Sequence, residues 1–141
     1  MRLILGAIMA ALLGPAVAWA EATPLPGYWE LSNTAKLVIS SRSTEKKCFT
    51  AADIDKVLEG PSNRHYKCTY PIRVVGGGKI RLTGTCVTKR GQVAEVTAEG
   101  TYSATAFRLR AKLKTKISGV QLAADASTTA RRLGDTCPPA V

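Results

Sequence analysis

The side chains best suited to chemistry in this chain are four cysteines, Cys48, Cys68, Cys86 and Cys137. An even number of cysteines is typical of exported domains, in which thiols are oxidised in pairs to disulfides. Structural zinc is the other common use of four cysteines, but it favours a C-x2-C pair, and the gaps between these cysteines are long. We therefore expect two disulfides, no metal site and no other cofactor.

Catalytic groups do not assemble from this sequence into any familiar arrangement. The single histidine, His65, has no serine and acid placed around it as nucleophile and orienting group. Asp53 and Asp55 are two residues apart on an expected helix, so their carboxylates cannot face each other. The glycines at 76–78 join two expected strands, whereas a phosphate-binding loop needs a following helix and a Lys-Ser/Thr pair. We expect no catalytic residue and no enzyme activity.

The opening segment has the three-part layout of a signal peptide: Arg2, an apolar run over residues 3–13, and small residues before Ala20. We expect cleavage after Ala20, so that residues 1–20 are removed and residues 21–141 form one domain. The alternative is an uncleaved anchor, although residues 3–20 are barely long enough to span a bilayer. The mature chain is then expected outside the cytosol, with no membrane span.

Periodicity predicts the first elements of this domain. Apolar and polar residues alternate over residues 27–40, which predicts a half-buried strand with Trp29 and Leu31 on its apolar face. A polar turn over residues 40–43 should lead to a short second strand that ends near Cys48. Thr50 can then cap a short helix near residues 51–59, because Asp53 stands at its third position.

From residue 64 onward the pattern predicts a meander of four hairpins. We place their turns at residues 76–78, 90–92, 104–105 and 119–120, where each register sets apolar residues opposite apolar residues on one face. Pro71 has no backbone donor, so its strand should be an edge or carry a bulge. The predicted fold is mainly β, a single curved antiparallel sheet of about seven strands, half-barrel or barrel-like, with one short helix. The expected cross-strand pairs include Val74 with Ile80, Ile72 with Leu82, Cys86 with Val96, Tyr102 with Phe107, and Leu109 with Ala130.

The same registers bear on the disulfide pairing. Cys68 and Cys86 are mirror-related about Gly77, which brings their Cβ atoms to cross-strand distance, and Cys48 would then pair with Cys137. Sequential pairing, Cys48 with Cys68 and Cys86 with Cys137, stays open, since directly opposed cross-strand disulfides are strained.

A strand of alternating cations is the one surface feature with a functional interpretation. The formal net charge of +10 becomes +9 once Arg2 is removed, which favours anionic partners in general. Arg73 is expected to face Arg81 nearby, while Glu99 should lie opposite Arg110, and Glu95 and Asp125 opposite Lys114. A solvated face with weak cross-strand ion pairs is the alternative to a docking surface. The five cations of the strand are Arg108, Arg110, Lys112, Lys114 and Lys116.

Several short motifs together resemble the DUF3617 family, small exported proteins of Gram-negative bacteria. They are Pro26-Gly27-Tyr28-Trp29-Glu30, the segment Cys48-Phe49-Thr50 before the short helix, the pair Cys68 and Cys86 around a Gly-containing hairpin, and Arg132, Gly134 and Cys137 near the end. The chain departs from the family pattern at Ala51-Ala52 and at the extra Thr136. The resemblance implies a periplasmic or secreted domain of unknown function and carries over no catalytic residue.

Two functions remain as hypotheses. The first is a non-enzymatic binding or structural domain whose basic face meets anionic lipid head groups, lipopolysaccharide or acidic polysaccharide. The second is a carrier that encloses a small apolar or lipid-like ligand within the curved sheet, with Trp29, Tyr70, Tyr102 and Phe107 pointing inward. Nucleic acid is not expected as a partner, because no aromatic residues interleave with the cations and export removes most targets.

Overall fold

The computed structural model describes residues 23–60, 62 and 65–139. The expected signal peptide therefore lies outside the described residues. No helix within the described part is long and apolar enough to cross a membrane. The elements are β1 (Gly27–Lys36), β2 (Ser40–Phe49), α1 (Ala51–Glu59), β3 (Tyr66–Gly76), β4 (Lys79–Thr88), β5 (Val93–Tyr102), β6 (Ala106–Ile117) and β7 (Val120–Gly134).

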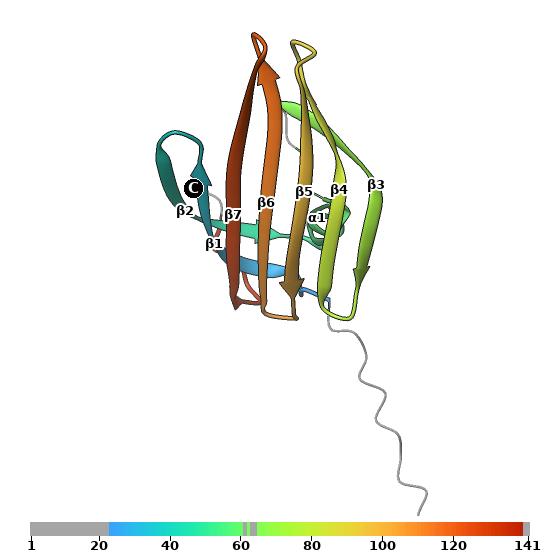
Figure 1. Ribbon diagram of the computed structural model, residues 1–141. Helices are drawn as coiled ribbons and strands as arrows, with labels where there is room; N and C mark the ends of the chain where they lie inside the picture. The colour runs from blue at the N-terminus through green and yellow to red at the C-terminus, as the bar shows by residue number, and fades with distance from the viewer. Residues whose placement is uncertain (1–22, 61, 63–64, 140–141) are drawn as a thin grey trace, which may run out of the picture.

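All strands of the described chain join one seven-stranded antiparallel sheet in the order β2-β1-β7-β6-β5-β4-β3. The last strand returns to lie beside the first, a long-range pairing that the local turn signals do not contain. The sheet is open, because β2 and β3 are its two edges. Figure 1 shows the curved sheet with α1 on its inner side, where the helix connects the two edge strands. The predicted fold class is confirmed.

Three of the four hairpin registers differ from the prediction, and only the β5–β6 register, which pairs Tyr102 with Phe107, was right. In β4–β5 and β6–β7 the partners shift by two residues, so that Cys86 lies opposite Ala94 and Leu109 opposite Thr128. A shift of two keeps every side chain on its face, because strand side chains alternate with a period of two. The buried face was therefore predicted correctly through incorrect pairs.

The β3–β4 hairpin was wrong by one residue along most of its length. Cys68 does lie opposite Cys86, but a bulge between Thr69 and Ile72 shifts the register, so that Val74 pairs with Arg81. Pro71 sits inside this bulge on an edge strand, as a residue without a backbone donor requires. The shift turns Ile72 and Val74 outward, and their side chains are 56% and 62% exposed.

The first hairpin was also misplaced. The strand predicted to run to residue 40 ends at Lys36, and the serines predicted as a turn begin β2. The turn itself consists of Leu37, Val38 and Ile39, all exposed. The alternating pattern carries on through this turn, so periodicity alone could not show where β1 stops.

The core gathers on the inner face of the sheet. Trp29 is completely buried, with its ring 6.2 Å from that of Phe49 and 5.6 Å from that of Phe107, and its indole nitrogen donates to the carbonyl oxygen of Leu25 at 3.0 Å. The helix adds Ile54, which is buried against the same cluster. Burial of an aliphatic side chain such as that of Ile54 contributes about 1.5–3 kcal/mol to the stability of the folded protein.

The expected inward positions of the aromatic residues are confirmed. Tyr102 and Phe107 are 8% exposed, and Tyr70 packs against the cluster while remaining partly accessible. The helix begins as predicted, since Thr50 and Asp53 form a reciprocal capping box at its first turn.

The disulfides follow the mirror pairing. Cys68 is bonded to Cys86 across β3 and β4, and Cys48 is bonded to Cys137, 89 residues away. Sequential pairing is therefore wrong for this structure. No free cysteine is found among the described residues.

Candidate functional site

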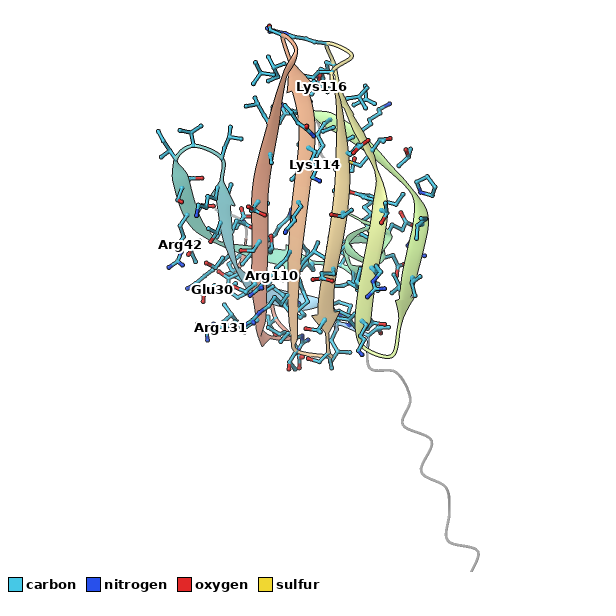
Figure 2. All side chains as sticks on the ribbon, in the orientation of Figure 1. Glu30, Arg42, Arg110, Lys114, Lys116 and Arg131 are labelled. Carbon is cyan, nitrogen blue, oxygen red and sulfur yellow. A yellow bond between two sulfur atoms is a disulfide. The ribbon has the colours of Figure 1, made fainter. Side chains whose placement is uncertain are left out.

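The five cations on β6 project from the outer face of the sheet, opposite to the core. Their burial alternates strictly with that of their neighbours: Leu109, Ala111 and Leu113 are partly buried, and every cation between them is exposed. This alternation follows from the pleat of the strand. Figure 2 shows Arg110, Lys114 and Lys116 spaced along β6 toward its upper end.

The acids expected to neutralise these cations lie beside them without closing ion pairs. Glu99 lies opposite Arg110 and Glu95 opposite Lys114, as predicted, whereas Asp125 faces Lys112 and not Lys114. Within the described ranges, the ion pairs shorter than 4 Å are Arg131 with Glu30 and Arg132 with Asp135. The β6 cations are therefore not held in direct ion pairs with the acids beside them.

A depression runs across this outer face beside the cations. It consists of two hollows of about 820 Å³ and 470 Å³ that share Arg81, Glu99 and Arg110. Small side chains such as Thr83, Thr97 and Ser127 form its base, while long cations rise around it. Its ionisable lining is six cations and two acids, namely Lys36, Lys79, Arg81, Arg108, Arg110 and Lys112 with Glu99 and Asp125.

Only some of the cations predicted for this surface line the depression. Arg81 lines the depression, but Arg73 does not face Arg81: the bulge in β3 places Arg73 opposite Leu82, and its Nε donates to the carbonyl oxygen of Leu58 at 3.2 Å. Arg73 thus belongs to the end of α1. Lys114 and Lys116 lie further along β6, beyond the residues that line the hollows.

Sequence reasoning missed two lining cations, Lys36 and Lys79. Lys36 reaches the depression because β1 pairs with β7, which sets it opposite Asp125. Lys79 directly follows the Gly77-Gly78 turn and faces outward like Arg81, because both alternate with the buried Ile80 and Leu82. Only β4 carries a net positive charge, from Lys79 and Arg81, whereas Glu30 balances Lys36 in β1, so no charge pattern marked Lys36.

A second concave region lies on the inner face beside α1. It comprises hollows of about 400 Å³ and 160 Å³ that share Leu109 and Thr128. Apolar side chains line both hollows, Phe49 and Val57 the larger and Leu113 the smaller, and the Thr128 hydroxyl donates to Oδ1 of Asn33 at 2.7 Å. The larger hollow is also lined by charged side chains, which are Lys47, Asp53, Lys56 and Glu59. Burial raises the pKa of Tyr70, which lines the smaller hollow, to about 12, and the neighbouring Tyr66 adds to this rise.

The residues considered for catalysis show no shared site. His65 is exposed just before β3, and Asp55 is exposed on α1. Asp53 caps the helix, and the backbone N–H and hydroxyl of Thr50 donate to it and lower the pKa of its carboxyl. Among the described residues no three His, Cys, Asp or Glu side chains cluster as metal ligands would.

The motifs that carry the family resemblance come together as a structural junction. Arg132 donates from Nε to the carbonyl oxygen of Pro26 at 3.0 Å, and a Cβ on Gly27 would collide with the carbonyl oxygen of Gly134. Cys137 of the terminal motif is bonded to Cys48 of the segment that precedes the helix. These residues fasten the ends of the domain to each other.

Comparison with known proteins gives a family and no activity. The family model described as "Protein of unknown function (DUF3617)" matches residues 24–137, which is most of the chain. No curated protein and no solved structure matches it. The match spans the whole sheet, the helix and both disulfides, and so the chain belongs to the DUF3617 family.

Proposed function

We propose that this is an exported, non-enzymatic binding domain of the bacterial envelope, and that its outer sheet face holds an anionic envelope component. Lipopolysaccharide phosphates, lipid head groups and acidic polysaccharide share the chemistry required, which is closely spaced phosphate, sulfate or carboxylate groups. The two disulfides support an oxidising compartment such as the periplasm.

The observation that carries the proposal is the depression with six cations against two acids. Three of the six are arginines, whose planar guanidinium groups bind phosphate and carboxylate through two parallel hydrogen bonds. Because the β6 cations form no ion pair within the described chain, an incoming anion does not have to displace an internal partner.

Salt-gradient elution from immobilised heparin tests the proposal with a defined polyanion. We expect the variant with Arg108→Glu, Arg110→Glu and Lys112→Glu, all of which line the depression, to elute at much lower salt than the wild type. The matched control carries Lys46→Glu, Lys56→Glu and Lys67→Glu, which changes the net charge equally at exposed positions that do not line the depression. Equal losses in both variants would show that net charge, and not this face, governs binding.

The inner concavity favours a second candidate function, the carriage of a small apolar ligand. Its two hollows together are of the size that a short acyl chain or a small lipid fragment occupies. Mass spectrometry of lipids that co-purify from native envelopes tests it. A defined lipid that disappears in a Leu109→Trp variant, in which the larger ring fills the shared wall, supports the carrier; a protein free of lipid supports surface docking alone.

A further inference from the structure

Exposed apolar side chains collect in the hairpin turns at one end of the sheet. The β1–β2 turn consists of Leu37, Val38 and Ile39, which are 57%, 90% and 82% exposed. Hairpin turns are normally built from Gly, Asn, Asp and Ser, and an exposed apolar tip has a cost in water that needs another reason. The turn does not serve the core, since the core side chains of β1 are Trp29 and Leu31, near its other end.

The outer half of this hairpin stands clear of the core. Every residue of β2 from Ser40 to Cys48 is exposed, as are Ala35 and Lys36 on β1. Figure 1 shows the hairpin projecting at one side of the sheet with its turn free. The three apolar side chains are thus presented to the solvent on an extended polar support.

Two other hairpins expose apolar side chains at the strand residues next to their turns. Val87 and Val93 face each other beside the β4–β5 turn and are 40% and 52% exposed. Ile117 and Val120 close the β6–β7 turn and are 45% and 60% exposed. Antiparallel pairing points all three turns in the same direction. The β4–β5 and β6–β7 turns form the upper end in Figure 1, whereas the β1–β2 turn lies lower and to the side, because β1 ends at Lys36, opposite Asp125, while β7 begins at Val120.

The opposite end of the sheet is built differently. Its turns are Gly77-Gly78 between β3 and β4, and Ser103, Ala104 and Thr105 between β5 and β6. None of these turn residues is a large apolar side chain. Apolar side chains are also exposed beside these turns, at Leu25 and Val74, so the distinguishing feature of the β1–β2 turn is that its own three residues are all apolar.

Cations surround the apolar turns. Lys36 and Arg42 flank the β1–β2 turn, Lys89 and Arg90 lie in the β4–β5 turn, and Lys114 and Lys116 approach the β6–β7 turn. Figure 2 shows Lys114 and Lys116 rising along β6 toward this end and Arg42 on the projecting hairpin. Apolar tips within a ring of cations match a bilayer surface, where phosphate groups lie just outside the acyl region.

We propose that the three hairpin turns at this end dock the domain onto an anionic lipid bilayer, with Leu37, Val38 and Ile39 inserted among the acyl chains. The cations around the turns then meet lipid phosphates. A second copy of the chain fits this end less well, because two such ends would bring like charges together. This docking goes beyond the outer-face function, since it requires apolar insertion, and of the cations around the turns only Lys36 also lines the depression.

Vesicle co-sedimentation with phosphatidylglycerol and phosphatidylcholine tests the proposal on residues 21–141. We expect Leu37→Ser, Val38→Ser and Ile39→Ser together to lower the partition coefficient about tenfold. Ile117→Ser with Val120→Ser should lower it in the same direction. The matched control is Leu25→Ser with Ile72→Ser, which removes similarly exposed apolar side chains that lie away from these turns and do not line the depression, and it should leave partitioning unchanged.

Two further measurements separate the alternatives. Retention on heparin should be the same in the turn variant and the wild type, so a failure of the outer-face proposal and a failure of this one are distinguishable. Partitioning that is equal in the turn variant, the control and the wild type overturns bilayer insertion. A concentration-dependent dimer that only the turn variant loses, without vesicle binding by the wild type, overturns it in favour of self-association.

Discussion

Cys48, near the end of the edge strand β2, is bonded to Cys137 in the tail that follows β7. Tyr28 pairs with Cys48 on β2 and with Gly134 at the end of β7, so the disulfide passes from one neighbour of β1 toward the tail beyond the other, with the two Cα atoms 5.8 Å apart. The bond therefore holds the edge strand β2 and the C-terminal tail to the strand between them. The Cys68–Cys86 bond acts more locally, within one hairpin.

The longer disulfide should contribute more to stability. A loop closed over 89 residues gives about 4.6 kcal/mol in the chain-entropy model, against about 3.2 kcal/mol for a loop over 18 residues. We expect Cys48→Ala with Cys137→Ala to lower the free energy of unfolding by more than Cys68→Ala with Cys86→Ala. Urea unfolding followed by circular dichroism gives both values, and a reversed order would contradict the loop-length explanation.

Gly84 should tolerate no side chain. It lies in β4 beside the bulge of β3, and a Cβ there would come within 1.9 Å of the carbonyl oxygen of Thr69, so the strand backbones would have to separate. We expect Gly84→Ala to lower the free energy of unfolding by about 3 kcal/mol. Gly134→Ala is the control, because a Cβ at Gly134 meets nothing within 4 Å. Equal stability of the two variants would mean that β3 and β4 are less close at the bulge.

Tyr70 should make stability fall in alkali. Its pKa is raised from 10.0 to about 12, first by burial and second by Tyr66, so the folded protein keeps a phenolic proton that the unfolded chain releases near pH 10. This contribution to stability is complete below pH 10 and is lost as the pH rises toward 12. Unfolding curves across that range should show a weaker decline in Tyr70→Phe. Tyr28→Phe, which removes another tyrosine hydroxyl, should keep the wild-type decline.

The sequence pattern predicts contacts between residues that are close in the chain, but it does not predict the pairing of strands that are far apart in the chain. The capping box of Thr50 and Asp53 predicted the first residue of the helix correctly, because a cap is a contact between residues only three positions apart. The buried face was also predicted, since a register error of two residues leaves each side chain on the same face. The pairing of β1 with β7 joins residues about a hundred positions apart, and no turn signal reports it.

The candidate site shows the same division. The β6 cations were predicted because alternation within one strand fixes their direction. The depression was not predicted, because its walls come from six strands together, namely β1, β3, β4, β5, β6 and β7. Arg73 was misplaced by the bulge at Pro71, which reverses the direction of each later side chain in β3. Small irregularities in strands thus limit what periodicity can say about a surface.

The first turn of α1 should give the domain an acid-sensitive component of stability. The backbone N–H of Thr50, and next its hydroxyl, donate to the carboxylate of Asp53 and lower its pKa below 3.8. A carboxyl whose folded pKa is lowered contributes above the unfolded value, and that contribution is lost as the pH falls through the folded value. We therefore expect the helix to become less stable below about pH 4, and with it the packing of Ile54 in the core.

Variants at the cap separate this component from general acid unfolding. Thr50→Ala should cost about 1 kcal/mol at neutral pH, because it removes the hydroxyl that accepts from the N–H of Asp53 at 3.2 Å. Asp53→Asn should flatten the decline in stability between pH 5 and pH 2, whereas Asp55→Asn, the same change two residues along the helix, should not. Urea unfolding at several pH values measures these slopes. Identical acid slopes in the two Asn variants would show that the capping box does not set the acid response.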